Sequence, residues 1–170
     1  IWLHGSPSGQ FARAPQASEG CVVLSNPDLN ALLARVSVRT TPVVIATELQ
    51  WVRPEALQAE REDFEATLAS WRALKSAGDL AQLQQHYSPR FGNQGQTLAD
   101  WWPRVEDDVK TKGERALQVK DLSVLRWLDQ DDTLVVTFGE VAEGARRGMT
   151  KRQYWMRENN QWKIIFEGAV

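Results

Sequence analysis

The chain has 170 residues, which suits one domain or one domain with part of another. Apolar residues make up 42% and charged residues 25%, as in ordinary globular proteins, and a net charge of −2 argues against nucleic acid as a partner. A single cysteine excludes an internal disulfide, two histidines and one cysteine cannot build the usual four-ligand zinc site, and no apolar run reaches the length of a membrane span.

Residues 1–46 alternate short apolar runs with loops rich in Gly, Pro and Ser. The segment "NPDLNALLARV" predicts a helix, with Asn26 as the candidate cap and Pro27 at the first helical position. Its apolar residues Leu29, Leu32, Leu33 and Val36 then fall on one face. Residues 47–53 are expected to form a linker.

Three helices are predicted after this linker. The first begins at Pro54 and runs to about residue 77, where Gly78 ends it. Asp79 can cap a short second helix, and Thr97 a third that contains Pro103. The long first helix carries a single apolar stripe, made of Leu57, Phe64, Leu68, Trp71 and Leu74.

Four strand-like runs follow Gly113, at 116–128, 132–142, 146–158 and 161–170. Short turns between them predict an antiparallel meander, and helices followed by such a sheet indicate an α+β fold. The sheet is expected to curve around the first helix and to pack on its apolar stripe. The inward residues expected from alternation are Leu134, Val136, Phe138, Trp162, Ile164 and Phe166.

The first 21 residues contain the groups that cysteine catalysis requires. His4 can accept the proton of Cys21, and the carbonyl of Gly5 can fix the tautomer of that imidazole. Gly20 allows a sharp turn whose backbone N–H groups can face an oxyanion, and Ser18 can support this turn through its hydroxyl. Judged from these residues alone, a buried structural cysteine is the alternative.

The order "LHG…SxGCVxLSN" resembles the active-site signature of YkuD-type L,D-transpeptidases, which are bacterial cell-wall enzymes with a mostly β catalytic domain. The resemblance covers residues 1 to about 46 and implies Cys21 as nucleophile, His4 as base and Gly5 as the residue that orients it. Glu19 stands where the commonest pattern has His, and Val23 where it has Arg. The Glu19 departure leaves transpeptidation and hydrolysis both open. Earlier strands of such a domain are expected before Ile1, so this chain alone is expected to be inactive.

Residues 54–170 resemble a nuclear transport factor 2-like (SnoaL-like) domain, in which helices and a curved sheet form a cystatin-like cone. The resemblance rests on the order of elements and on the final "W-x-I-x-F" run. It implies a pocket, and His86 is expected to be a solvated surface residue rather than a base. The candidate pocket residues, each of which also suits the core, are Trp71, Tyr87, Trp102, Trp127, Phe138, Tyr154 and Trp155.

Together the resemblances predict part of a peptidoglycan L,D-transpeptidase or L,D-carboxypeptidase that acts through a cysteine thioester. The expected domains are the catalytic fragment 1–46, the linker 47–53 and the cone 54–170. Peptidoglycan stem peptides are the expected substrate, with no cofactor, a periplasmic or cell-envelope location, and a homodimer through the cone sheet. The alternative is a non-enzymatic module of the nuclear transport factor 2-like type that binds a ligand or dimerises.

Overall fold

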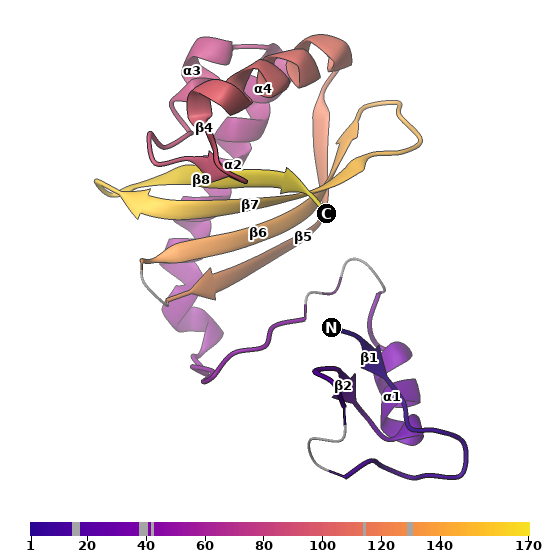
Figure 1. The fold of residues 1–170 in the computed structure, drawn as a ribbon. Coiled ribbons are helices and arrows are strands. Elements are labelled where there is room, and N and C mark those ends of the chain that lie inside the picture. Colours follow the sequence, from indigo (N-terminus) through magenta and orange to yellow (C-terminus); the bar gives the residue numbers. More distant parts are fainter. Residues whose placement is uncertain (15–17, 38–40, 42, 114, 129–130) are drawn as a thin grey trace. The chain divides into compact units, whose positions relative to one another are not determined.

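A computed structural model describes residues 1–14, 18–37, 41, 43–113, 115–128 and 131–170. The chain divides into two compact units, Ile1–Val43 and Val44–Val170 (Figure 1). Among the described residues, no helix combines the length and apolar character needed to cross a membrane.

The first unit consists of two short parallel strands and one helix. Strand β1 (Leu3–His4) pairs with β2 (Val22–Val23), and α1 (Asn26–Leu33) follows directly. The helix cap is Ser25 rather than Asn26, because the Ser25 hydroxyl accepts a hydrogen bond from the backbone N–H of Asp28 at 3.3 Å. The Asn26 amide instead donates to the carbonyl of Ser6 at 3.1 Å, which ties α1 to the loop after β1.

The second unit begins with helices that start and end as their local sequence requires. A 3₁₀ turn at Pro54 leads into the long helix α2, which Gly78 ends in a left-handed conformation. Asp79 caps the next helix, while Thr97 and Asp100 form a reciprocal capping box on the last. The helical segments are η1 (Pro54–Leu57), α2 (Gln58–Ala77), α3 (Leu80–Gln84) and α4 (Leu98–Lys112).

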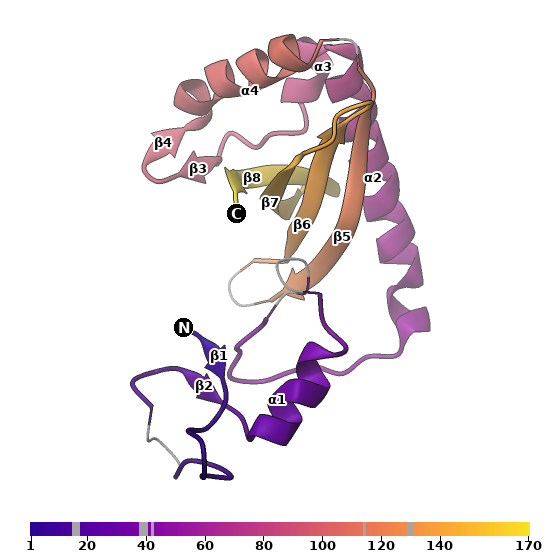
Figure 2. The ribbon, with the colours of Figure 1, turned by 90° about the vertical axis from the view of Figure 1, so that its right-hand side faces the viewer.

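A curved four-stranded antiparallel sheet forms the other half of this unit (Figure 2). Its strands follow one another in sequence order as a meander, which agrees with the predicted α+β fold. A small hairpin, β3 (Gly92–Asn93) with β4 (Gln96–Thr97), occupies the segment before α4. The sheet strands are β5 (Leu117–Trp127), β6 (Thr133–Ala142), β7 (Met149–Glu158) and β8 (Gln161–Ala169).

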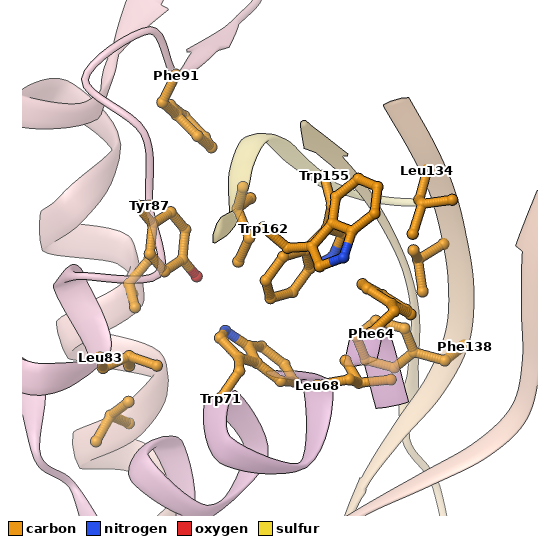
Figure 3. Close-up of a cluster of buried hydrophobic side chains, with 14 residues drawn as sticks. Phe64, Leu68, Trp71, Leu83, Tyr87, Phe91, Leu134, Phe138, Trp155 and Trp162 are labelled. Atoms are coloured by element: carbon orange, nitrogen blue, oxygen red, sulfur yellow. The ribbon is translucent and has the colours of Figure 1, made fainter. Parts of the chain in front are cut away.

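The core lies between α2 and the inner face of this sheet (Figure 3). Phe64 meets the ring of Trp155 edge-on at 5.5 Å, and Trp71 meets Phe138 at 5.7 Å. Such edge contacts between buried rings stabilise beyond the area they bury. The predicted helix stripe therefore supplies the core through its central residues, whereas Leu57 and Leu74 stay partly exposed.

One expected core residue, Phe166, lies on the opposite face of the sheet. The pairing of β7 with β8 shifts between Tyr154 and Trp155, where an irregularity leaves Ile165 without a partner. The alternation of inward and outward side chains along β8 is therefore shifted by one residue after Ile164. As a result, the ring of Phe166 lies against the outward ring of Tyr154, with 4.8 Å between the ring centres. The next residue, Glu167, becomes the buried one.

Candidate functional site

The parallel strands of the first unit bring His4 and Cys21 onto neighbouring backbones. Val22 donates to the carbonyl of Trp2 at 2.9 Å, and Leu24 to that of His4 at 3.0 Å. His4 is paired with Val23. Cys21 directly precedes β2, and continuing the alternation of that strand by one residue would place Cys21 on the same face as His4.

The imidazole of His4 is fixed by the residue that follows it. Nδ1 of His4 lies 2.8 Å from the carbonyl oxygen of Gly5. A carbonyl can only accept, so Nδ1 is the donor, and in the neutral tautomer this contact selects Nε2 as the nitrogen with the lone pair. A Cβ at position 5 would overlap the side-chain oxygen of Asn26, so any larger residue there would displace the amide that bonds to Ser6. Gly5 thus orients the imidazole while packing against the start of α1.

The turn before β2 is built by Ser18 and Gly20. The Ser18 hydroxyl donates to the carbonyl of Cys21 at 2.6 Å, which closes the turn, and Gly20 has a φ of +93° that favours glycine. Cys21 is a half-buried free thiol. Glu19 is exposed to solvent. The arrangement provides a thiol and an imidazole oriented by a backbone carbonyl, which are the two groups needed for nucleophilic attack with general-base help.

The seven aromatic residues proposed for the cone pocket lie in three different environments. Four of them are core residues: Trp71, Tyr87, Phe138 and Trp155. Trp102 is half-buried beside the Tyr87 ring at 5.4 Å, and Trp127 and Tyr154 contact each other at 6.3 Å on the outward face of the sheet. None of the seven lines either of the two grooves described for this unit. The interior is instead filled by rings and by buried charges.

Six charged side chains form what we call the buried charge cluster: Lys75, Asp108, Lys112, Glu140, Lys151 and Glu167. Its centre is Lys75, whose side chain is 1% exposed and lies 2.7 Å from Asp108 and 2.8 Å from Glu140. Lys112 contacts these same two carboxylates. Three ammonium groups face three carboxylates, so the cluster has no net charge when all six are ionised.

Lys151 joins this centre to a second chain of hydrogen bonds. It lies 3.2 Å from Asp108 and 3.4 Å from Glu167. The carboxylate of Glu167 also accepts from Tyr87 at 3.0 Å and from Gln153 at 2.6 Å. Buried carboxylates with several donors of this kind are satisfied rather than orphaned.

The ammonium groups decide the ionisation of the carboxyls. Burial works to raise the pKa of Glu167 and of Asp108, but the charges of Lys151 and Lys75 hold both pKa values below their ordinary range. Burial also works to lower the pKa of Lys151, yet Glu167 and Asp108 raise it overall. The pKa of Tyr87 is raised by burial and by Glu167, so its hydroxyl stays a donor.

Sequence reasoning missed this cluster, although alternation contained the signal. Glu140 continues the inward series that ends in Phe138, and Lys151 precedes Gln153 and Trp155 at the same spacing. The alternation of β6 and β7 therefore places the charged residues Glu140 and Lys151 on the face toward the core. A shallow groove of about 390 Å³ beside α4 opens beside the cluster at Asp108.

The cone fold and the short strands before it define the class: a nuclear transport factor 2-like domain that follows a YkuD-like segment. The family model of the Cds6 C-terminal NTF2-like domain matches residues 63–168, and the chain belongs to this family. The model of the YkuD L,D-transpeptidase catalytic domain matches residues 1–45. No curated protein matches the chain.

Solved structures share this fold at low sequence identity. Bd1075 of Bdellovibrio bacteriovorus is 22% identical to this chain, with a TM-score of 0.65. The match covers 99% of this chain and 60% of the Bd1075 chain. Pgp2 of Campylobacter jejuni, a helical cell shape determining protein, is 17% identical with a TM-score of 0.59. The match covers 98% of this chain and 59% of the Pgp2 chain. An NTF2-like protein with a cystatin-like fold from Novosphingobium aromaticivorans is 15% identical with a TM-score of 0.50. The match covers 68% of this chain and 83% of the Novosphingobium chain. The chain thus spans about 60% of the first two relatives.

Proposed function

We propose that the protein is a peptidoglycan-modifying L,D-transpeptidase or L,D-carboxypeptidase that uses Cys21 as its nucleophile. The observation that carries this proposal is the bond from His4 Nδ1 to the Gly5 carbonyl, on a strand adjacent to Cys21. The YkuD match over residues 1–45 supports it independently. A periplasmic or cell-envelope location follows from the substrate.

The proposed reaction has two steps that balance. Nε2 of His4 takes the proton of the Cys21 thiol, and the sulfur attacks the amide carbonyl that joins an L-centre to a D-residue of the stem peptide. The amide C–N bond breaks, the leaving amine receives the proton from His4, and a thioester remains. Backbone N–H groups at the Gly20 turn face the oxygen that gains negative charge.

The second step decides between hydrolysis and transfer. Water gives a trimmed stem peptide, whereas the amine of another stem gives a cross-link, and both regenerate the thiol. Glu19 stands at the position where the commonest family pattern has His, so it marks the residue to vary. Analysis of products from disaccharide–tetrapeptide substrates separates the two outcomes.

The catalytic role is tested in the protein that contains this chain within a complete YkuD-type domain. Cys21→Ala and His4→Ala are each expected to abolish turnover of muropeptides, because nucleophile and base act as a unit. Asn30→Ala, an exposed change on α1, is the matched control and should keep parental turnover. Near-normal turnover by Cys21→Ala would disprove the thioester mechanism.

Thiol reactivity separates this proposal from a non-enzymatic module. A nucleophilic Cys21 should react rapidly with iodoacetamide at neutral pH, and His4→Ala should slow that reaction. A thiol that reacts slowly, with no effect of His4→Ala, would favour the alternative of a binding or dimerisation module.

A further inference from the structure

The peptide unit that joins Gly5 to Ser6 lies between the base of the proposed site and the first turn of α1. Its carbonyl, which belongs to Gly5, accepts a hydrogen bond from Nδ1 of His4 at 2.8 Å. Glycine restricts its own backbone less than any other residue, so the direction of this carbonyl depends on contacts made by the neighbouring residues. The groups that hold this peptide unit therefore also decide how the imidazole is oriented.

The backbone is fixed on both sides of this peptide unit. On one side, the carbonyl of His4 accepts from the backbone N–H of Leu24 at 3.0 Å. On the other side, Ser6 is only 9% exposed, and its hydroxyl can donate to the carbonyl of Phe11 at 3.3 Å or to that of Leu24 at 3.4 Å. These contacts hold the two ends of the segment, and they leave the carbonyl of Ser6 to a different donor.

Asn26 supplies that donor from the first residue of α1. Its Nδ2 donates to the carbonyl of Ser6 at 3.1 Å, and its Oδ1 faces Gly5 closely enough to overlap any Cβ placed there. One amide side chain therefore contacts both residues of the peptide unit, one through each of its polar atoms. The hydroxyl of Ser25 caps α1, so the start of the helix does not depend on Asn26.

We propose that Asn26 is a positioning residue for His4, whose amide holds the Gly5 carbonyl against Nδ1 and so leaves Nε2 to accept the thiol proton. This role rests on the proposed function, in which His4 is the base. Asn26 reaches the imidazole through Gly5 and Ser6, so its loss should misorient the base rather than remove it. The same contact explains the glycine at position 5, because a side chain there would occupy the space of the Asn26 amide.

The first test measures turnover of muropeptides by the protein that contains this chain within a complete YkuD-type domain. Asn26→Ala removes both amide contacts, and alanine is the residue that a helix tolerates best. We expect kcat to fall about fivefold or more with KM changed by less than about twofold, because the orientation of the base matters in the transition state rather than in substrate binding. Asn30→Ala, the same change one turn later on the exposed face of α1, is the matched control and should keep the parental kcat.

The tautomer of His4 gives a second measurement, which a general loss of stability would not change in this way. A spectrum of the ¹⁵N-histidine-labelled protein at about pH 8.5, where histidine is ordinarily neutral, shows which ring nitrogen carries the hydrogen. In the parent, the His4 signals, assigned with His4→Ala, should be those of the Nδ1–H form. In Asn26→Ala they should move toward a mixture with the Nε2–H form.

His86 is the internal reference for this spectrum. It lines a groove of about 490 Å³ in the second unit and is half-buried, with its Nε2 3.3 Å from the hydroxyl of Ser70, which corrects the expectation of a solvated surface residue. Burial, and then the charge of Lys163, lower the pKa of His86, so its imidazole is also neutral in this experiment. Its signals should be the same in the parent and in Asn26→Ala.

A double substitution tests the coupling between Asn26 and the glycine. Gly5→Ala alone should lower kcat, because its methyl group displaces the amide of Asn26. Once Asn26→Ala has removed that amide, adding Gly5→Ala should cause little further loss.

Three outcomes would overturn the proposal: a parental kcat in Asn26→Ala, a His4 tautomer that this substitution leaves unchanged, and independent effects of Gly5→Ala and Asn26→Ala. The tautomer measurement needs no turnover, so the two proposals fail separately. A tautomer that depends on Asn26, in a protein whose turnover survives Cys21→Ala, refutes only the proposed function. Turnover that depends on Cys21 but is unaffected by Asn26→Ala refutes only the role of Asn26.

Discussion

Every buried apolar side chain among the described residues belongs to the second unit, and none to the first. In the first unit the side chains that are buried are Ser6 and Ser25, which hold the loop and the helix cap. The apolar face predicted for α1 is only partly covered: Leu33 is 49% exposed, and the other three residues, Leu29, Leu32 and Val36, are half-buried. The second unit instead encloses three buried tryptophans between α2 and the sheet.

The candidate catalytic residues thus lie in the first unit, whereas the buried core that stabilises the fold lies in the second. The cysteine turn is specified by short-range contacts, such as Ser18 to Cys21 and His4 to Gly5, and these need no core of their own. Such local hydrogen bonds each contribute about 1 kcal/mol, whereas a buried tryptophan contributes several. The first unit therefore has the more recognisable motif, and the second has the means to fold.

The largest expected effect is the loss of folding when the two regions are separated. Residues 54–170 should fold alone, because their core needs no contribution from residues 1–46. Residues 1–46 alone should stay unfolded, since little apolar surface is buried there. Circular dichroism and thermal melts of both fragments measure this directly. A cone fragment that melts cooperatively only with residues 1–46 attached would show one interdependent domain.

Two tryptophan substitutions compare the core of the second unit with its exposed first residues in the intact chain. Trp71→Ala should reduce the free energy of unfolding by about 3–5 kcal/mol, because the removed ring is fully buried against Phe138. Trp51→Ala, in the predicted linker, should change it by less than about 0.5 kcal/mol, since that ring is 89% exposed. Urea unfolding measures both, and a similar loss for the two would contradict the burial described here.

The buried charge cluster should respond to the removal of one partner. Lys75→Met is expected to cost about 3 kcal/mol, because Glu140 loses a close ammonium while remaining fully buried. Adding Glu140→Leu should restore much of that loss, since the pair is then replaced by apolar groups. Double-mutant analysis by urea unfolding gives the coupling, and strict additivity would mean that the two side chains do not depend on each other.

Helices, strands and their order follow from periodicity because each is a local property of the chain. The interior of the cone was less predictable, since its residues meet across long sequence separations. Lys75 and Glu140 are 65 residues apart. Phe166 was misplaced because an irregularity between β7 and β8 reverses the alternation, a displacement that no local pattern announces. The contact of His4 with the Gly5 carbonyl could be predicted because the two residues are adjacent in one short motif, whereas the catalytic role of Cys21 stays a prediction.

Acid is expected to weaken the second unit through the same cluster. Asp108 and Glu167 have pKa values below their ordinary 3.8 and 4.5, so the unfolded chain binds protons at a higher pH than the folded one. Their contribution is complete above those ordinary values and is lost as the pH falls through the lower folded values. Urea unfolding from pH 7 to pH 3 should show this decline, and Asp108→Asn should flatten it. Parallel curves for parent and variant would contradict the assignment to Asp108.

The smallest expected effect concerns Glu19, which lies two residues before the thiol. Its side chain is exposed, and the charge of a solvated carboxylate is strongly screened by water and salt. Glu19→Gln should therefore change the rate of Cys21 alkylation at neutral pH by less than about twofold, equivalent to roughly 0.4 kcal/mol. Glu55→Gln, an exposed change in the second unit, serves as the control. A large acceleration in Glu19→Gln alone would show that the carboxylate opposes thiolate formation, and would tie the departure from the family pattern to the chemistry of the turn.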